Sequence, residues 1–421
     1  MRLSWHFGLG RELGFVFWAL TLFEAAYGAF ATIWPLWIEH LGASITTVGL
    51  ILGMAGVIRP FVLLGGSWLA DRVNTRNLLI VARSFLVAGI VFAAFARTWE
   101  LLLITVVAYS FGELIFPILH AHIPVHAGDN VGRAFSLTCT IGPSLALIVT
   151  PVVTSAVIDS FGMQGALLLS AGLSTIGTLC IAGMNFSRDR ELSRSDTAAT
   201  IADVVRHTNT RDIIAFHAVT VFALGLGSTL LPNFLQHQRD LSPGLIALLA
   251  GGSAVGTAIF GFASLRVTGI RRAPFLAAAL TTGCTATGFL LLALSDLLPV
   301  IAFAFILRGG FFATWTFLLT AIGQHAPAKI QSRAFAVVEI FGGGAVSFSP
   351  VVASVLYRVN PSLPLYIAVC FGLVMAGLIV LRYRRGFEPE PRIQLVADQT
   401  EPVEEMSGLP GEMQPEPAIP A

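Results

Sequence analysis

Long apolar segments separated by short polar connections fill most of this chain. A helix that spans a membrane needs about 20 mainly apolar residues. Segments of this kind lie at approximately 14–37, 47–70, 78–96, 100–121, 135–157, 163–184, 213–236, 244–265, 273–294, 299–322, 334–357 and 363–383. The pattern predicts an all-α integral membrane protein with 12 transmembrane helices, six on either side of a polar linker.

One apolar stretch occurs twice, about 200 residues apart. Residues 133–157 and residues 333–356 both begin Arg-Ala-Phe, and both carry Pro-Val-Val-x-Ser after a long apolar run. A repeat at half of the chain length, in a chain this apolar, is more typical of membrane transporters than of solenoids, whose periods are tens of residues. We therefore predict two pseudo-symmetric six-helix bundles, at residues 1–184 and 213–385, joined by a cytoplasmic linker at 185–212.

Composition supports a membrane location. Hydrophobic residues make up 55% of the chain and charged residues 12%, which is more apolar surface than soluble domains can bury. The net charge is +1 and no basic run with interleaved aromatic residues occurs, so we expect no nucleic acid partner. Residues 386–421 are rich in Pro and Glu and poor in apolar residues, which predicts a disordered, acidic, Pro-rich cytoplasmic tail.

The distribution of Lys and Arg predicts the orientation in the membrane. With the N-terminus inside, 20 of the 25 basic residues fall in inner connections, among them Arg83, and three fall in outer ones. The remaining two, Arg59 and Arg308, lie within the membrane. Because inner loops carry an excess of Lys and Arg, we predict a multi-pass protein of the inner cell membrane with both termini in the cytoplasm.

The connection between the second and third apolar segments, residues 65–79, has the sequence GGSWLADRVNTRNLL. It resembles the cytoplasmic loop typical of the major facilitator superfamily, Gly-x-Leu-Ala-Asp-Arg-x-Gly-Arg-Lys. The matching residues are Leu69, Ala70, Asp71, Arg72 and Arg76. Ser67 and Asn74 stand in place of the two glycines, and Asn74 suits a turn with positive φ because asparagine tolerates that conformation.

The resemblance implies two bundles that rock about a central cavity lined by the first, fourth, seventh and tenth helices, in a protein that is a monomer. It also implies that Asp71, Arg72 and Arg76 belong to an inner gate, in which the aspartate faces a helix N-terminus of the other bundle when the cavity opens outward. The alternative is a solvated loop that obeys the positive-inside rule. That alternative explains the two arginines but does not account for Asp71.

Five ionisable side chains lie within the predicted spans: Glu24, Arg59, Glu113, Arg308 and Glu339. A charge at the centre of a membrane helix costs about 2.5–3.5 kcal/mol on insertion scales, so such residues persist where they are paired, hydrated or functional. The resemblance places Glu24, Glu113 and Arg308 at the cavity, and Tyr27 shares a helix face with Glu24. Glu339 lies near the inner end of the eleventh span, where the positive helix N-terminus favours a carboxylate, so we expect a structural role for it.

We hypothesise that Glu24 or Glu113 carries a proton, because desolvation disfavours the charged form of a carboxylic acid in an apolar cavity. Arg308 would hold an anionic solute or tune a nearby carboxylate, since arginine stays charged. The alternative is a static interhelical salt bridge, either Glu113 with Arg308 or Glu24 with Arg59. Arg59 precedes Pro60 and is as consistent with a structural pair as with a substrate contact.

The sequence contains no Gly-Lys-Ser/Thr nucleotide loop and no recognisable sodium site, which favours a proton gradient as the energy source. We predict a proton-coupled secondary active transporter of a small organic solute. The Ile-Gly-Pro at residues 141–143 resembles a fragment of the proton antiporter motif and favours efflux. Tyr27, Trp34 and Trp37 resemble the first helix of sugar and aromatic-acid symporters, so proton-coupled uptake is the alternative. A second class is a sensor or scaffold that keeps the fold without transport.

We expect no enzyme chemistry, metal site or cofactor. The predicted helices carry no paired nucleophile and base, and His120, His122 and His126 lack a zinc-binding spacing. The four cysteines lie singly in apolar segments. The substrate depends on side chains from many helices, so the expected partners go no further than a small-molecule solute, protons and the lipid bilayer.

Overall fold

A computed structural model describes residues 5–70, 72–127, 131–186, 201–267 and 273–385. Within these ranges every regular element is a helix, which confirms the all-α prediction. The predicted tail at 386–421 and residues 187–200 of the predicted linker lie outside the described residues. Residues 1–387 belong to one compact unit, and the boundaries of the two bundles within it stay a prediction.

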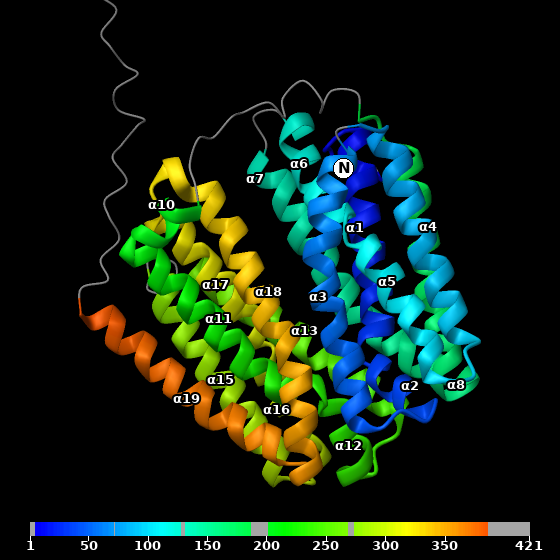
Figure 1. Cartoon of the computed structure of the whole chain (residues 1–421), viewed down its shortest axis with the longest axis vertical. Coiled ribbons are helices and arrows are strands. Elements are labelled where there is room, and N and C mark those ends of the chain that lie inside the picture. Colours follow the sequence, from blue (N-terminus) through cyan, green and yellow to red (C-terminus); the bar gives the residue numbers. More distant parts are fainter. Residues whose placement is uncertain (1–4, 71, 128–130, 187–200, 268–272, 386–421) are drawn as a thin grey trace, which may run out of the picture. The chain divides into compact units, whose positions relative to one another are not determined.

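The N-terminal half contains the first six predicted spans (Figure 1). Its helices are α1 (Arg11–Ala31), α2 (Trp34–His40), α3 (Ile45–Ala70), α4 (Thr75–Ala94), the 3₁₀ turn η1 (Trp99–Leu101), α5 (Leu102–Gly112), α6 (Ile115–Ala127), α7 (Val131–Phe135), the π-helical turn η3 (Ser136–Ile141) and α8 (Gly142–Ala182). α8 runs through both the fifth and the sixth span and bends at Gly162, whose φ of 68° is left-handed. Glycine adopts this conformation without the steric cost of a Cβ.

The C-terminal half contains the remaining six spans. Its helices are α10 (Ile201–Arg206), α11 (Thr208–Thr229), α12 (Leu231–Arg239), α13 (Pro243–Arg266), α15 (Pro274–Leu294), α16 (Leu298–Arg308), α17 (Gly310–His325), α18 (Ala328–Val359) and α19 (Leu363–Arg384). Among the described residues, ten helical stretches are long and apolar enough to cross a membrane. One of them, Arg133–Ala182, covers two predicted spans, and the fourth predicted span is divided between α5 and α6, so the count is consistent with the predicted twelve.

The first, fourth, seventh and tenth spans are each broken in two. α1 ends before α2, α5 before α6, α11 before α12 and α16 before α17. Pro35 and Pro232 stand in the first turn of α2 and of α12, where the missing N–H of proline costs no helical hydrogen bond. Glu113 follows the end of α5, and Gly309 separates α16 from α17. The breaks therefore occupy equivalent places in the two halves, as expected for a duplicated chain.

The buried core is shared at one end of the helices and divided at the other. One cluster joins residues of both halves, among them Phe30 and Ile90 with Phe234 and Phe289. A second cluster lies within the C-terminal half and includes Phe275, Leu318 and Val338. A third lies within the N-terminal half and includes Leu13, Leu79 and Leu119. The halves therefore pack against each other at the end where α2 and α12 lie, which we call the α12 end.

Close helix packing joins the halves toward the α12 end. A Cβ added at Gly49 of α3 would lie 2.4 Å from the Cβ of Ser354 and 2.5 Å from the carbonyl oxygen of Pro350, both on α18. One added at Gly244 of α13 would lie 2.4 Å from the Asp159 carboxylate on α8. At Gly49 these distances leave no room for a larger side chain, and at Gly244 the Asp159 carboxylate would have to move. Small residues thus bring the backbones of the two halves into contact.

Polar contacts also connect the halves at the α12 end. Asn233 Nδ2, on α12, donates to Glu39 Oε2, on α2, over 2.6 Å. His237 Nε2 lies 3.3 Å from Glu39 Oε1, and His237 Nδ1 lies 3.1 Å from the Tyr357 hydroxyl on α18. Sequence patterns do not predict that these four residues meet, because they come from three distant helices.

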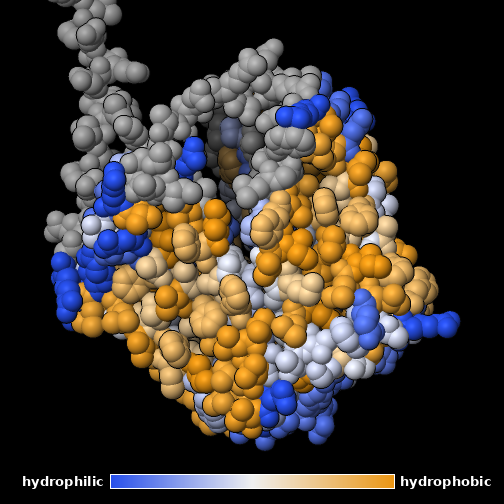
Figure 2. Space-filling model, viewed as in Figure 1, coloured by the Kyte–Doolittle hydropathy of each residue, from blue (hydrophilic) through white to orange (hydrophobic). Residues whose placement is uncertain are grey.

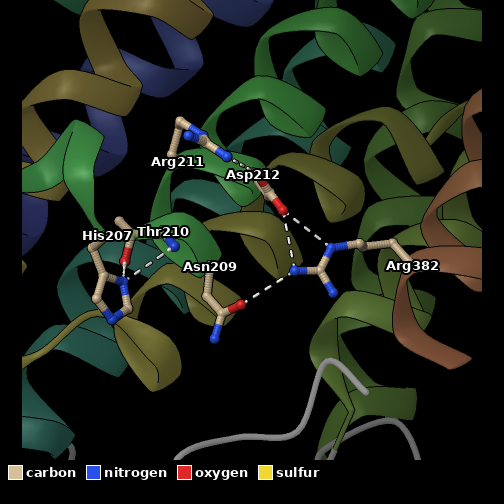
Figure 3. A network of polar contacts seen from close by, with 6 residues as sticks. All are labelled: His207, Asn209, Thr210, Arg211, Asp212 and Arg382. Atoms are coloured by element: carbon tan, nitrogen blue, oxygen red, sulfur yellow. Dashed lines mark hydrogen bonds and ion pairs between the residues drawn. The ribbon is translucent and has the colours of Figure 1, made fainter. Parts of the chain in front are cut away.

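At the opposite end, the start of α11 is tied to the end of α19 (Figure 3). Arg382 donates from Nε to Asp212 Oδ2 over 3.1 Å and from Nη2 to Asn209 Oδ1 over 3.2 Å. His207 caps α11 by accepting a hydrogen bond from the Thr210 amide. These contacts lie within the C-terminal half.

Hydrophobic residues cover most of the face seen in Figure 2, and hydrophilic residues gather toward its two ends. Large apolar side chains such as Phe61 (72% exposed) and Phe161 (73%) stand on the outer surface of the protein, as expected of helices that face lipid. The same view shows the surface hollowed between α18 on one side and α6 and α7 on the other, away from the α12 end.

Candidate functional site

A group of charged and aromatic side chains lies around Tyr27 of α1. Tyr27 is 41% exposed although it stands inside a helix whose other residues are largely buried. The charges of Glu24, Glu113, Arg59 and Arg308 all act on its hydroxyl. These four residues come from four different spans. The structure therefore places Glu24, Glu113, Arg59 and Arg308 within electrostatic range of Tyr27.

Glu113 stands at the break between α5 and α6 and pairs with Arg59 of α3. Arg59 Nη2 lies 3.6 Å from Glu113 Oε2, with the two side chains 40% and 17% exposed. The two salt bridges considered from the sequence, Glu113 with Arg308 and Glu24 with Arg59, are not among the ion pairs of the described residues. The observed pair is longer than a charge-assisted hydrogen bond, and Arg59 is partly exposed.

Arg83 is a site residue that the sequence placed wrongly, in an inner connection. It is 4% exposed and lies on α4 inside the N-terminal half. Its guanidinium sits 3.6 Å from the centre of the Phe23 ring, and it donates to the Gly112 carbonyl over 3.4 Å and to the Ser174 hydroxyl over 3.3 Å. Its charge acts on both Glu24 and Glu113. The feature of the sequence that could have identified Arg83 is its position inside the third apolar segment, residues 78–96.

Arg308 is the last residue of α16, directly before the break at Gly309. Its Nη1 donates to the Ser253 hydroxyl over 3.4 Å, and its guanidinium lies 5.1 Å from the centre of the Phe305 ring. It lies within electrostatic reach of the Tyr27 hydroxyl, which belongs to the other half. Among the described residues it forms no ion pair with a carboxylate.

Glu339 lies on the exposed side of α18. α18 begins at Ala328, so Glu339 is three turns from the helix N-terminus and beyond the reach of its partial charge. The physical reason given from the sequence for a structural role is therefore wrong. The Trp315 side chain and the charge of Arg59 both lie within reach of the Glu339 carboxylate. Arg59 thus lies within electrostatic reach of carboxylates from both halves.

The sequence model described as Major Facilitator Superfamily matches residues 16–208 and 213–410. The chain belongs to the major facilitator superfamily. No curated protein is a significant match. The solved structure of a point mutant of the nucleoside transporter NupG is similar with a TM-score of 0.75 and 13% identity, over 89% of this chain and 100% of that one.

Two further solved structures of similar fold differ in what they bind. A POT family transporter in complex with a thioalcohol conjugated peptide has a TM-score of 0.71 and 12% identity, over 89% of this chain and 96% of that one. The human organic anion transporter MFSD10 (TETRAN) has a TM-score of 0.60 and 15% identity, over 90% and 99%. At these identities the likeness shows the fold alone. This superfamily member is therefore a multi-pass membrane protein whose substrate the comparisons leave open.

The loop that carried the resemblance is partly described. Asp71 lies outside the described residues, and Arg72 is exposed. Arg76 donates from Nη2 to the Ala182 carbonyl at the end of α8, so it joins two helices of the N-terminal half. Asn74 has a φ of −66° and caps α4 by accepting a hydrogen bond from the Asn77 amide over 3.3 Å. The expectation of a positive φ at Asn74 is wrong, because this asparagine serves as an N-cap.

Proposed function

We propose that this chain is a proton-coupled secondary active transporter of a small organic solute, working by alternating access. The observation that carries the proposal is the group around Tyr27, which combines two carboxylic acids with arginines from both halves. Such groups persist in a membrane interior where they take part in transport. The exposure of Tyr27 supports a solute site beside it.

In this proposal Glu113 or Glu24 carries the proton, and Arg59 couples protonation to motion. Ionised Glu113 holds Arg59 at the junction of α5 and α6. A proton on Glu113 removes that attraction and leaves Arg59 under the influence of Glu339 on α18. Because α18 belongs to the other half, the change alters the balance of charge between the two halves.

The arrangement of the core supports alternating access. The halves share one core at the α12 end and have separate cores beyond it, so the solute site is sealed on one side by packed side chains. Glu39, His237 and Asn233 add polar contacts to that seal. The excess of basic residues supports placing the opposite end in the cytoplasm, which makes this the inward-facing state.

Direction is the open part of this proposal. The Ile-Gly-Pro fragment favoured proton antiport, with symport as the alternative. A Cβ at Gly142 would lie 2.2 Å from the Thr21 hydroxyl and 2.9 Å from the Phe17 ring, so packing against α1 accounts for this glycine. This packing requires a glycine in either direction of transport. The gating role of Asp71 with Arg72 and Arg76 stays part of the proposal, because Arg76 fixes the loop to α8.

The test is the internal pH of proteoliposomes, followed with a trapped dye while sugars, organic acids, amino acids, nucleosides and amphipathic drugs are added outside. A solute that enters with a proton acidifies the lumen, and one that exchanges for a proton makes it alkaline. Glu113→Gln and Glu24→Gln should abolish the signal. A solute that crosses without any pH change would contradict proton coupling, and folded protein that moves no solute would favour the sensor or scaffold.

A further inference from the structure

The guanidinium groups around Tyr27 are not all matched with carboxylates. Arg59, Arg83 and Arg308 bring three guanidinium groups, and Glu24, Glu113 and, within reach of Arg59, Glu339 bring the carboxylates. Arg59 pairs with Glu113, and Arg83 acts on both glutamates from within the N-terminal half. Arg308 forms no ion pair with a carboxylate of the described residues, and each proton taken up by a glutamate makes the group more positive.

Arg308 is the arginine of this group that stands apart from the carboxylates. One of its N–H groups donates to the Ser253 hydroxyl, and among the described residues it has no carboxylate partner. A guanidinium has five N–H donors in a planar fork, so most of them are left for another acceptor. An unpaired cation in a membrane interior is costly, and an anion that enters the site removes that cost.

The backbone that carries Arg308 is held in a fixed position. A Cβ at Gly309 would lie 2.4 Å from the Ser253 carbonyl oxygen and 2.5 Å from the Thr257 nitrogen, so the end of α16 contacts the backbone of α13. The Thr257 hydroxyl donates to the Gly309 carbonyl over 3.0 Å. A binding group on such a rigid support keeps its geometry without help from the ligand.

We propose that the substrate is an organic anion whose carboxylate binds Arg308 of the C-terminal half beside the Tyr27 hydroxyl of the N-terminal half. This substrate class rests on the transporter function proposed above. The guanidinium fork matches a carboxylate with two parallel hydrogen bonds, and the phenol can donate a third.

The same charges determine whether proton binding strengthens or weakens the binding of the anion. A proton on Glu113 or Glu24 raises the positive charge of the site and strengthens the binding of an anion. By linkage the anion strengthens the binding of the proton to the same degree. Proton and anion are therefore bound together and released together, which is symport.

The test uses purified full-length protein and sets of small-molecule probes. The members of a set share one organic framework and differ only in the charged or polar group that they carry. The carboxylates are gluconate, hippurate and N-acetylleucine, and each is compared with its neutral amide and with an amine of the same framework. Binding is measured as the shift in thermal unfolding over a concentration series at pH 6 and pH 8. We expect at least one carboxylate to bind, more tightly at pH 6, and its amide and amine to bind at least 10-fold more weakly.

Arg308→Gln should weaken carboxylate binding about 10- to 100-fold, as expected for loss of a charged hydrogen-bond donor. Arg308→Lys keeps the charge and should lose less, and it covers the case in which the glutamine variant fails to fold. Arg358→Gln removes an exposed arginine at the end of α18 and should change nothing. Equal binding of amide or amine, binding by none of the sets, or wild-type binding by both Arg308 variants would overturn the proposal.

Different experimental results would overturn the anion site and the proposed proton-coupled transport. A neutral or cationic solute that moves with a proton in proteoliposomes would overturn the anion site and leave proton-coupled transport intact. A carboxylate that binds through Arg308 but crosses without a proton would keep the anion site and overturn proton coupling.

Discussion

Gly49→Ala should shift the protein away from the conformation described above. The alanine Cβ would fall 2.4 Å from the Ser354 Cβ and 2.5 Å from the Pro350 carbonyl oxygen. Neither neighbour can rotate out of the way, so α3 and α18 must separate. Overpacking of this kind costs about 1–3 kcal/mol. The cost applies only to the state in which these helices touch, so the ratio of the two states should change about 5- to 150-fold.

The assay is the distance between spin labels on opposite sides of the α12 end. Cysteines at His40 of α2 and Gln238 of α12 provide the sites, since both residues are exposed, in a background without the four native cysteines. In lipid nanodiscs the wild type should give mainly the short distance. Gly49→Ala should move population to a longer one.

Gly172→Ala is the matched control, because a Cβ there would meet no heavy atom of the described residues within 4 Å. It introduces the same chemical change in a membrane helix and should leave the distance distribution unchanged. If Gly49→Ala gives the same distribution as the wild type and the control, the contact between α3 and α18 does not belong to one state of the cycle, and the reasoning fails.

Four further tests address separate parts of the site. Glu113→Gln and Glu24→Gln should each abolish accumulation driven by a proton gradient while solute exchange continues, because glutamine carries no proton; accumulation at the wild-type level would refute the role of that residue. Arg83→Met should lower stability by about 1–3 kcal/mol, seen as an earlier thermal unfolding midpoint, because its hydrogen bonds to the N-terminal half are lost; an unchanged midpoint would count against the buried site. Glu39→Gln should increase labelling of cysteines at the α12 end, and equal labelling would show that its contacts do not seal that end. Asp71→Asn should slow transport with little change in solute affinity, and a normal rate would contradict the gate.

The helical architecture could be predicted because spans are set by a simple length of apolar sequence. Twelve segments, the repeat near Pro151 and Pro350 and the loop before Arg76 were enough for the fold. The ends of the helices were predicted less accurately. α18 begins at Ala328, six residues before the predicted span, and that difference removed the reason given for Glu339.

Most residues of the site could be predicted, but which of them contact one another could not. Charges within apolar segments identified Glu113, Arg59 and Arg308, since such residues are costly wherever they occur. Which of them meet depends on how each helix is rotated, and helices that are apolar all round carry little information about rotation. Arg83 was missed for a related reason. It lies six residues into the predicted span, and its contacts with Phe23, Gly112 and Ser174, all distant in sequence, show that it turns inward.

A proton gradient should drive solute across the membrane through the group around Tyr27. The most direct measurement is accumulation of a radiolabelled solute in proteoliposomes under an imposed proton gradient, compared between the wild type and Glu113→Gln. We expect accumulation above equilibrium in the wild type, and equilibration without accumulation in the variant. Accumulation by the variant, or equilibration alone by the wild type, would contradict the claim.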